Sequence, residues 1–194
     1  MGPLPATDRD NKYILVISDY FTKWTESYPM PNQSAETVAN VVVREFISRF
    51  GVPRQLHTDQ GRNFDSKLFQ AMCSIMEIDK TRTTRLRPQS DRMVERFSRT
   101  LEAMLSKFVD RDQKDWNLYL PLVMMAYGTS VHESTGFSPN EMMLGREVLL
   151  PLDLVGGQAE PTGNSTTEYA DRLSEQMERI HQFARHHLKL SSDR

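Results

Sequence analysis

The alternation of apolar and polar residues in the first half of the chain predicts short strands separated by helices. Residues 13–17 form a continuous apolar and β-branched run, which is typical of a buried strand. Residues 24–28 alternate in the manner of a partner strand, and Pro29 and Pro31 are expected to end it. Further short strands are predicted over 54–58 and 78–84.

Apolar residues at helical spacing predict the helices between and after these strands. Ser34 can cap the first helix, and Gly51 and Pro53 are expected to stop it. Its apolar positions are Val38, Val41, Val42, Phe46 and Phe50. Further helices are predicted over 66–76, from Ser90 onward and over 116–127.

The long helix that starts at Ser90 has one apolar face and carries a glutamate beside it. At about 100° per residue, Glu95 lies roughly 120° from the centre of the apolar stripe, and so off the core face. The stripe consists of Val94, Phe97, Leu101, Met104, Leu105 and Phe108.

The last third of the chain predicts a loop-rich stretch, a linker and a final helix. Residues 130–152 are expected to be rich in loops, and residues 156–165 to form a linker between a core domain over 1–155 and a helix over 166–194. The apolar stripe of that helix fits self-association and packing back on the core equally well. It contains Tyr169, Leu173, Met177, Ile180 and Ala184. The order of the elements predicts an α/β domain with a mixed sheet, followed by an extra C-terminal helix.

Composition narrows the class of protein without identifying a partner. A chain of 194 residues with 38% hydrophobic and 26% charged residues suits one globular domain with an appended helix. No apolar run approaches the length of a membrane span, and residues 1–5 lack the features of a signal peptide, so no membrane partner is expected. The single Cys73 excludes an internal disulfide and a cysteine-rich zinc site, and fits a reducing compartment.

Charge is distributed unevenly, although the net charge is only −2. Between residues 80 and 99, seven basic residues stand against Asp91 and Glu95, which gives a local charge of +5. Such a patch can bind the phosphates of a nucleic acid, and a solvated basic face is an equally open interpretation. The basic residues are Lys80, Arg82, Arg85, Arg87, Arg92, Arg96 and Arg99, of which the last five are candidates for nucleic-acid binding.

Two carboxylates stand out within this pattern. Asp59 directly follows the strand predicted over 54–58, and Glu95 lies one turn into the long helix. Carboxylates on rigid elements, surrounded by Arg and Lys, suit divalent-metal phosphoryl-transfer chemistry. Each has a simpler interpretation as well: Asp59 could cap a turn that contains Gly61, and Glu95 could form an i,i+4 ion pair with Arg99.

Short motifs in a fixed order surround both carboxylates. They are Gly2-Pro3-Leu4-Pro5, Asp19-Tyr20-Phe21-Thr22-Lys23-Trp24, Phe50-Gly51-Val52-Pro53, His57-Thr58-Asp59-Gln60-Gly61, Pro88-Gln89-Ser90-Asp91, Val94-Glu95-Arg96-Phe97 and Ser134-Thr135-Gly136-Phe137-Ser138-Pro139. With these motifs, residues 2–155 resemble the catalytic core of retroelement integrases, especially the gypsy-type retrotransposon branch.

The resemblance implies a fold, a site and a function. The fold is RNase-H-like, with a mixed sheet flanked by helices. The family has a triad of two Asp and one Glu, with 35 residues between the second and third members, and 35 residues separate Asp59 from Glu95 here. These two residues would be catalytic and would bind two Mg²⁺ (or Mn²⁺) ions, while Gln60 and Asn63 belong to the loop that meets the substrate.

The same resemblance implies the partners and the place of action. DNA would be the partner, with metal-dependent phosphodiester cleavage and strand transfer as the chemistry and no small-molecule substrate. A homo-oligomer acting in the nucleus, after a cytoplasmic stage, is expected. A generic RNase-H-like nuclease is disfavoured, because the segment from Ser134 to Arg146 suits integrases.

The sequence departs from the family pattern in ways that affect the site. The family's first catalytic Asp lies on the strand just before the Gly-Pro-Leu-Pro segment, and this sequence begins at Met1. A truncated first strand and an impaired metal site are therefore expected; Asp19 matches a family Asp outside the triad. Arg87 and Arg92 stand where the family usually has His and Gly.

These departures leave an alternative open. The chain could be a catalytically inactive, degenerate or domesticated integrase-like module that binds nucleic acid or protein. Because the sequence ends soon after the predicted core, neither the family's downstream small domain nor its upstream His/Cys zinc-binding segment is expected within these residues.

Overall fold

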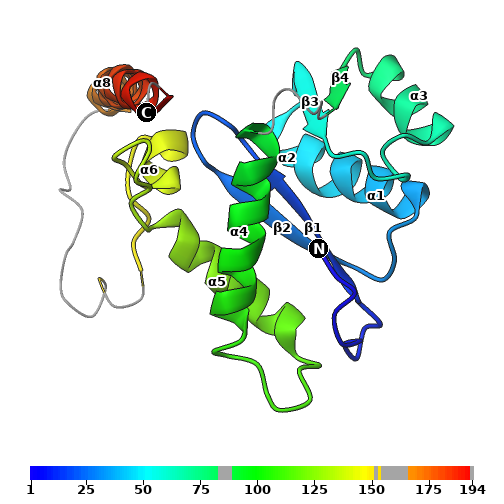
Figure 1. Ribbon diagram of the computed structural model, residues 1–194. Coiled ribbons are helices and arrows are strands. Elements are labelled where there is room, and N and C mark those ends of the chain that lie inside the picture. The colour runs from blue at the N-terminus through cyan, green and yellow to red at the C-terminus, as the bar shows by residue number, and fades with distance from the viewer. Residues whose placement is uncertain (83–88, 151–152, 154–165, 193–194) are drawn as a thin grey trace. The chain divides into compact units, whose positions relative to one another are not determined.

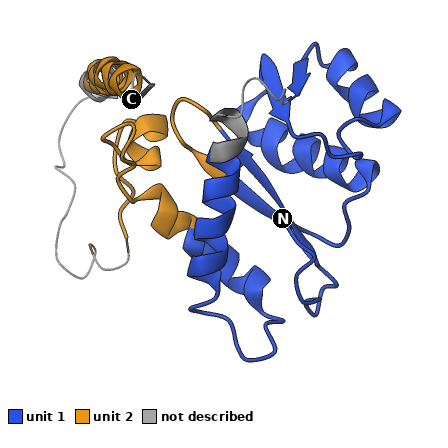
Figure 2. Ribbon diagram, viewed as in Figure 1, with its two compact units in different colours: residues 1–18, 26–123 blue, residues 19–25, 124–194 orange. Residues whose placement is uncertain are grey.

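The computed structural model describes residues 1–82, 89–150, 153 and 166–192 (Figure 1). The chain forms two compact units. Unit 1 contains residues 1–18 and 26–123, and unit 2 contains residues 19–25 and 124–194 (Figure 2). Each candidate carboxylate belongs to unit 1.

The strands of unit 1 form two short sheets. β1 (Tyr13–Ser18) pairs with β2 (Thr25–Met30), and β3 (Gln55–Thr58) pairs with β4 (Asp79–Arg82). The β3–β4 pair is parallel, with Gln55 opposite Asp79 and Thr58 opposite Arg82. The sequence predicts each of these strands at its place in the chain.

Pro29 does not end the second strand, contrary to the expectation from the sequence. β2 continues through Pro29 to Met30, and Pro29 is exposed. Proline is tolerated in a strand where its missing N–H would face outward from the sheet. Both strands of a two-stranded sheet have such an outer side, so the proline costs no ladder hydrogen bond here.

The helix predicted from Ser34 to Gly51 is present, with an irregularity that the sequence does not predict. α1 (Ala35–Val41) is capped by Ser34, whose side chain accepts from the Thr37 backbone N–H. The helix continues through the π-helical segment η1 (Val42–Ile47) and the short α2 (Ser48–Phe50), and Gly51 ends it at φ 81°. A positive φ favours glycine, which confirms the predicted stop.

The main core of unit 1 lies between its sheets and two helical segments. α3 (Lys67–Ile75) is capped by Ser66 and buries Phe69 and Cys73. These side chains pack in one cluster with residues from every neighbouring element, including Leu15, Tyr28, Met30, Val38, Ala39, Val42 and Ile78.

α4 and the first part of α5, up to Val123, complete unit 1. α4 (Gln89–Leu105) packs against β1 and buries Phe97, Leu101 and Leu105 (Figure 1). Phe108, predicted on the same stripe, is exposed and stacks instead on Tyr119. The stripe ends because the helix ends at Leu105 and a tighter turn follows, in which Phe108 N–H donates to the Leu105 carbonyl. α5 (Trp116–Gly128) begins with the buried Trp116.

Unit 2 contains a helix in the stretch that the sequence predicts as loop-rich. α6 (Pro139–Leu144) is capped by Ser138, whose side chain accepts from the Glu141 N–H, and it ends at Gly145 with φ 71°. Ser before Pro at the first helical position and Gly after the end are helix start and stop signals. The loop prediction was therefore wrong over these residues, because the helix is too short to show periodicity.

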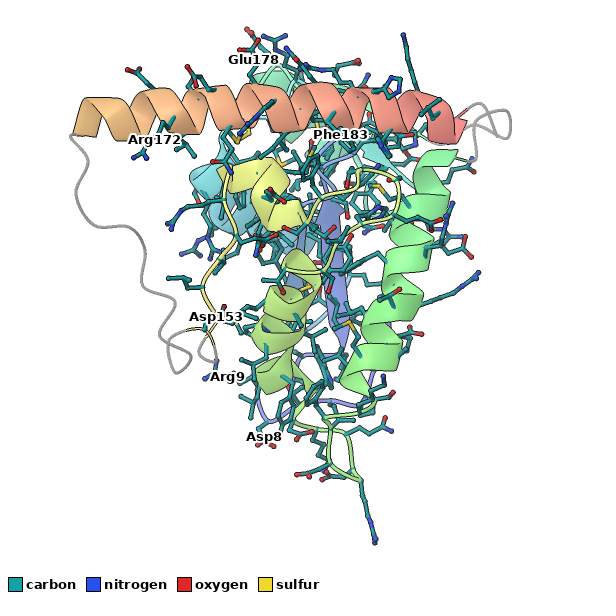
Figure 3. The ribbon with its side chains drawn as sticks, turned by 90° about the vertical axis from the view of Figure 1, so that its left-hand side faces the viewer. Asp8, Arg9, Asp153, Arg172, Glu178 and Phe183 are labelled. Atoms are coloured by element: carbon teal, nitrogen blue, oxygen red, sulfur yellow. The ribbon has the colours of Figure 1, made fainter. Side chains whose placement is uncertain are left out.

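α8 (Thr166–Ser192) packs on α6 within unit 2, which is one of the two arrangements that its amphipathic pattern leaves open. Ile180 and Ala184 are buried against Met142, and His181 Nε2 lies 2.9 Å from the Met142 carbonyl oxygen. Figure 3 shows Glu178 on the side of α8 that points away from α6. The interpretation that this stripe packs back on the chain is thus observed, whereas the domain limits at 155 and 166 stay a prediction. The predicted linker lies outside the described residues.

Among the described residues, no helix combines the length and the apolar character that crossing a membrane requires.

Candidate metal and nucleic-acid site

Asp59 is held in a turn directly after β3. The Gly61 backbone N–H donates a hydrogen bond to Asp59 Oδ1 over 2.9 Å. The Asp59 side chain is exposed, so its carboxylate faces solvent from the end of a strand. The turn-capping interpretation is therefore correct, and it is compatible with metal binding because it also fixes the direction of the carboxylate.

Gly61 permits an approach of two oxygen-bearing side chains that any other residue would disturb. A Cβ atom at this position would lie 2.6 Å from Asn63 Oδ1 and 2.9 Å from Asp59 Oδ1. The two oxygens thus flank the same point of the backbone. Carboxylate and amide oxygens are the donors that hard divalent cations prefer, so this turn has the right donor chemistry for Mg²⁺. The sequence marks Gly61 only as a turn residue; its role in the packing of Asp59 and Asn63 is visible only in three dimensions.

Gly61→Ala is expected to displace Asp59 and Asn63 with little loss of overall stability. The atoms that the new methyl group would meet are the ends of two exposed or half-buried side chains, which can move. We expect a destabilisation of about 1 kcal/mol, at the low end for added core volume, and a fall of about 2–4 °C in Tm. Thermal melting measures the loss of stability. Mn²⁺ titration measures whether the displacement of Asp59 and Asn63 weakens cation binding. Unchanged Mn²⁺ binding would show that the turn geometry is irrelevant to the cation.

Glu95 lies on the exposed side of α4, opposite the buried Phe97 and Leu101, as the helical spacing predicts. Arg99 Nη2 donates to Glu95 Oε1 over 2.6 Å. The pairing with Arg99 that the sequence leaves open is therefore present. Arg96 is exposed on the same helix, so one carboxylate and two guanidinium groups share this part of α4.

The predicted basic patch is described in part. Arg96 and Arg99 are described, Arg85 and Arg87 lie outside the described residues, and only the backbone of Arg92 is described, within α4. Gln60 is exposed next to Asp59. Within the described part of the chain, no group of three or more His, Cys, Asp or Glu side chains could hold a metal ion. The structure thus supplies the donor types for a cation at Asp59 and on α4, without a three-member cluster.

The start of the chain runs along β1 close to Asp59. The Met1 amino group donates to the Ile14 carbonyl over 2.9 Å, and Ile14 N–H donates to the Met1 carbonyl over 3.0 Å. Burial lowers the pKa of this amino group, while the negative charges of Asp59 and Glu102 act in the opposite direction. Met1 therefore pairs with β1 through both of these hydrogen bonds.

Asp19 has a structural role in the loop after β1. Its Oδ1 accepts from both the backbone N–H and the hydroxyl of Thr22, each over 2.7 Å. This pairing fits the interpretation of Asp19 as a residue outside the triad.

Comparison with known proteins finds similar sequences in one family. The profile of the "Integrase core domain" family matches residues 2–88. The chain is 28% identical over 151 residues to the retrovirus-related Pol polyprotein from transposon 412 of Drosophila melanogaster, which covers 78% of this chain and 12% of that protein. It is 34% identical over 135 residues to the Gag-Pol polyprotein of feline leukemia virus, covering 69% of this chain and 8% of that protein.

Solved structures agree with the sequence comparison. The catalytic core domain of BIV integrase superposes with a TM-score of 0.56 and 25% identity, covering 68% of this chain and 85% of that one. A chain of the simian T-cell lymphotropic virus intasome, in complex with PP2A regulatory subunit B56 gamma, shares the fold with a TM-score of 0.55 and 19% identity, covering 77% of this chain and 54% of that one. The fold is that of the RNase-H-like integrase cores.

The chain therefore belongs to the retroelement integrase catalytic cores, and this membership supports a role in DNA integration. It spans only a small part of the curated polyproteins that it matches, 12% of the transposon 412 protein and 8% of the feline leukemia virus protein.

Proposed function

We propose that this chain is the DNA-binding catalytic core of a retroelement integrase and acts in DNA integration. In this proposal Asp59 and Glu95 supply carboxylates to Mg²⁺ (or Mn²⁺), and the arginines of α4 bind DNA phosphates. The observation that carries it is that both carboxylates are exposed on unit 1, one at the end of a strand and the other on a helix beside two arginines. The order of motifs around them supports the same assignment.

The residues of the turn and of α4 have separate tasks in this proposal. Asp59, oriented by the Gly61 N–H, and Asn63 would present oxygen donors to the ion, and the exposed Gln60 next to Asp59 would contact an adjacent phosphodiester. A bound divalent ion would polarise the phosphodiester and neutralise developing charge. Arg96 and Arg99 would hold the neighbouring phosphates, since guanidinium groups match phosphate oxygens in geometry and charge.

The proposed partners are DNA and a second copy of the chain, and the proposed place of action is the nucleus after a cytoplasmic stage. α5 supports the homo-oligomer, because it carries apolar side chains on an exposed face as well as on its buried one. Leu118, Leu122 and Met125 recur at i, i+4 and i+7 and are exposed. An exposed apolar stripe of this kind is typical of an interaction surface.

Arg99→Gln is expected to weaken binding of the intact chain to a duplex oligonucleotide and to make binding less dependent on salt. Removal of one phosphate contact should flatten the slope of log K against log salt by about 0.9. Arg49→Gln is a matched control, because Arg49 also forms an exposed i,i+4 ion pair, with Glu45 over 2.8 Å. Fluorescence anisotropy at several salt concentrations measures both variants. Equal behaviour of the two would contradict a DNA-binding role for α4.

The second candidate is an integrase-like module that binds DNA without performing the chemistry. The observation that favours it is the Glu95–Arg99 ion pair, in which Arg99 Nη2 lies 2.6 Å from Glu95 Oε1 and occupies one oxygen of that carboxylate. The two candidates agree on DNA binding and differ in Mg²⁺-dependent turnover, which an Asp59→Asn variant can test.

A further inference from the structure

A pocket on unit 1, next to the turn that holds Asp59, has the composition of an anion site. It lies between α3 and β4 and has a volume of about 490 Å³. Two buried residues, Cys73 and Ile78, contribute apolar surface, and Gln70 and Ser74 of α3 contribute polar groups. The charged residues that line it are Asp65, Lys80 and Arg82.

One carboxylate, that of Asp65, forms ion pairs with two cations in this pocket. Lys80 Nζ lies 3.4 Å from Asp65 Oδ1, and Arg82 Nη1 lies 3.3 Å from Asp65 Oδ2. Both separations are long for ion-paired hydrogen bonds, which are usually about 2.7–2.9 Å. The three side chains together leave one positive charge unbalanced at the pocket.

The side chain of Lys80, which carries part of this excess charge, is largely buried. Only 12% of its side chain is exposed, compared with 32% for Asp65 and 64% for Arg82. A cation removed from water needs a closely bound counter-charge, and a shared carboxylate at 3.4 Å provides only part of one. An anion entering the pocket would meet a partly desolvated lysine and, nearer to solvent, a guanidinium group.

The parallel register explains why the two cations lie together. In β4, Lys80 and Arg82 alternate with Thr81, so they point to the same face of the sheet, opposite Leu56 and Thr58 of β3. Thr81 points to the other face, where its hydroxyl lies 3.0 Å from His57 Nδ1. The carboxylate of Asp65, 15 residues before Lys80, is brought across from the segment that precedes α3.

We propose that this pocket binds a phosphate group of a polynucleotide backbone, with Lys80 and Arg82 as the cationic contacts and Gln70 and Ser74 as hydrogen-bonding groups. The proposal rests on the proposed DNA-binding function and adds a contact that lies outside the candidate arginines of the sequence. Free phosphate shares the same chemistry, so the experiment separates the two sources.

The first arm measures oligonucleotide binding by the intact chain. Lys80→Gln and Arg82→Gln are each expected to weaken binding about threefold to tenfold and to flatten the salt slope by about 0.7–0.9. Lys12→Gln and Arg49→Gln are the matched controls, because each removes a cation that pairs with a surface carboxylate elsewhere, at 3.0 Å and 2.8 Å. The controls are expected to change binding by less than about twofold, because neither cation lines the pocket.

Asp65→Asn distinguishes an anion site from a structural ion pair by the sign of its effect. Removal of the only carboxylate among the residues that line the pocket should tighten oligonucleotide binding, because the net charge at the pocket rises. If the ion pairs served the fold alone, the variant would lower the melting temperature without tightening binding. Arg82→Lys, which keeps the charge on an exposed position, should retain most of the affinity.

The second arm follows backbone amide shifts of the intact chain during titration with inorganic phosphate. We expect saturable shifts at Asp65, Lys80 and Arg82 that Lys80→Gln abolishes. Such shifts without any oligonucleotide binding would overturn the proposed DNA-binding function and assign the pocket to free phosphate. The phosphate-binding proposal would be overturned if the pocket variants bound the oligonucleotide as tightly as the controls and phosphate caused no shifts. If Lys80→Gln fails to fold, Arg82→Gln tests the same proposal, because the Arg82 side chain is largely exposed.

Discussion

Asp59→Asn is expected to weaken Mn²⁺ binding by the intact chain by roughly 100-fold or more, because even residues that only orient a metal ligand cost about 10- to 100-fold when they are removed. The turn should survive, since an asparagine oxygen can still accept the Gly61 N–H bond that Asp59 Oδ1 accepts over 2.9 Å. The variant therefore removes charge while it preserves shape. Paramagnetic broadening of the amide signals of residues 59–63 during Mn²⁺ titration measures the effect.

Asp79→Asn is the matched control for this variant. Asp79 is an exposed aspartate on β4 that accepts a 2.8 Å hydrogen bond from Gln55 Nε2, and it lies opposite Gln55 in the sheet. Its replacement should leave Mn²⁺ broadening near Asp59 unchanged. Equal losses of Mn²⁺ affinity in both variants would mean that the chain attracts Mn²⁺ by general charge, and the assignment of Asp59 would fail.

The same pair of variants separates the two candidate functions. Mg²⁺-dependent nicking of a DNA end that disappears in Asp59→Asn, and persists in Asp79→Asn, would support a working catalytic core. DNA binding without turnover by the unaltered chain would support the binding module.

Trp116→Ala is expected to cause the largest loss of stability, about 3–5 kcal/mol, because a large buried aromatic side chain leaves a cavity that its surroundings fill poorly. Trp116 is 3% exposed, and its Nε1–H donates to the Pro5 carbonyl over 2.9 Å. The bond ties the start of α5 to the segment Gly2–Pro5, which is separated from it by more than a hundred residues. Chemical denaturation followed by circular dichroism measures the change.

Trp116→Phe separates the hydrogen bond from the packing. It keeps most of the ring volume and leaves the Pro5 carbonyl without its donor, at an expected cost of about 1–3 kcal/mol. The order Ala, then Phe, then the unaltered chain in rising stability is therefore expected. A Phe variant as unstable as the Ala variant would show that the Pro5 contact, and not the buried ring, holds this corner of unit 1.

Much of the local structure follows from residues close together in the sequence. Ser34 caps the helix that begins after it, as predicted. Ser66 caps the helix that was predicted to start at residue 66. The apolar run at 13–17 forms β1. Helix caps and strand runs depend on hydrogen bonds and burial within a few residues, which a sequence displays directly. The family resemblance is of the same kind, because it rests on short motifs at fixed spacing.

Other features depend on which distant residues meet. Pro29 stays in β2 because of its position in a two-stranded sheet, and α6 was missed because six residues give no periodic signal. Phe108 leaves the core because α4 ends before it. Each of these outcomes was decided by neighbours or by an element boundary, not by the hydrophobicity of the residue itself.

The sequence by itself determined the family, the order of the main elements and the candidate pair Asp59 and Glu95, because motif spacing and periodicity are properties of a one-dimensional chain. Only the tertiary structure decided that Asn63 shares the space over Gly61 with Asp59, and that Asp65 is divided between Lys80 and Arg82. Distances between side chains decide charge balance and donor geometry, and those distances are set by the turn around Gly61 and by the packing of α3 on β4.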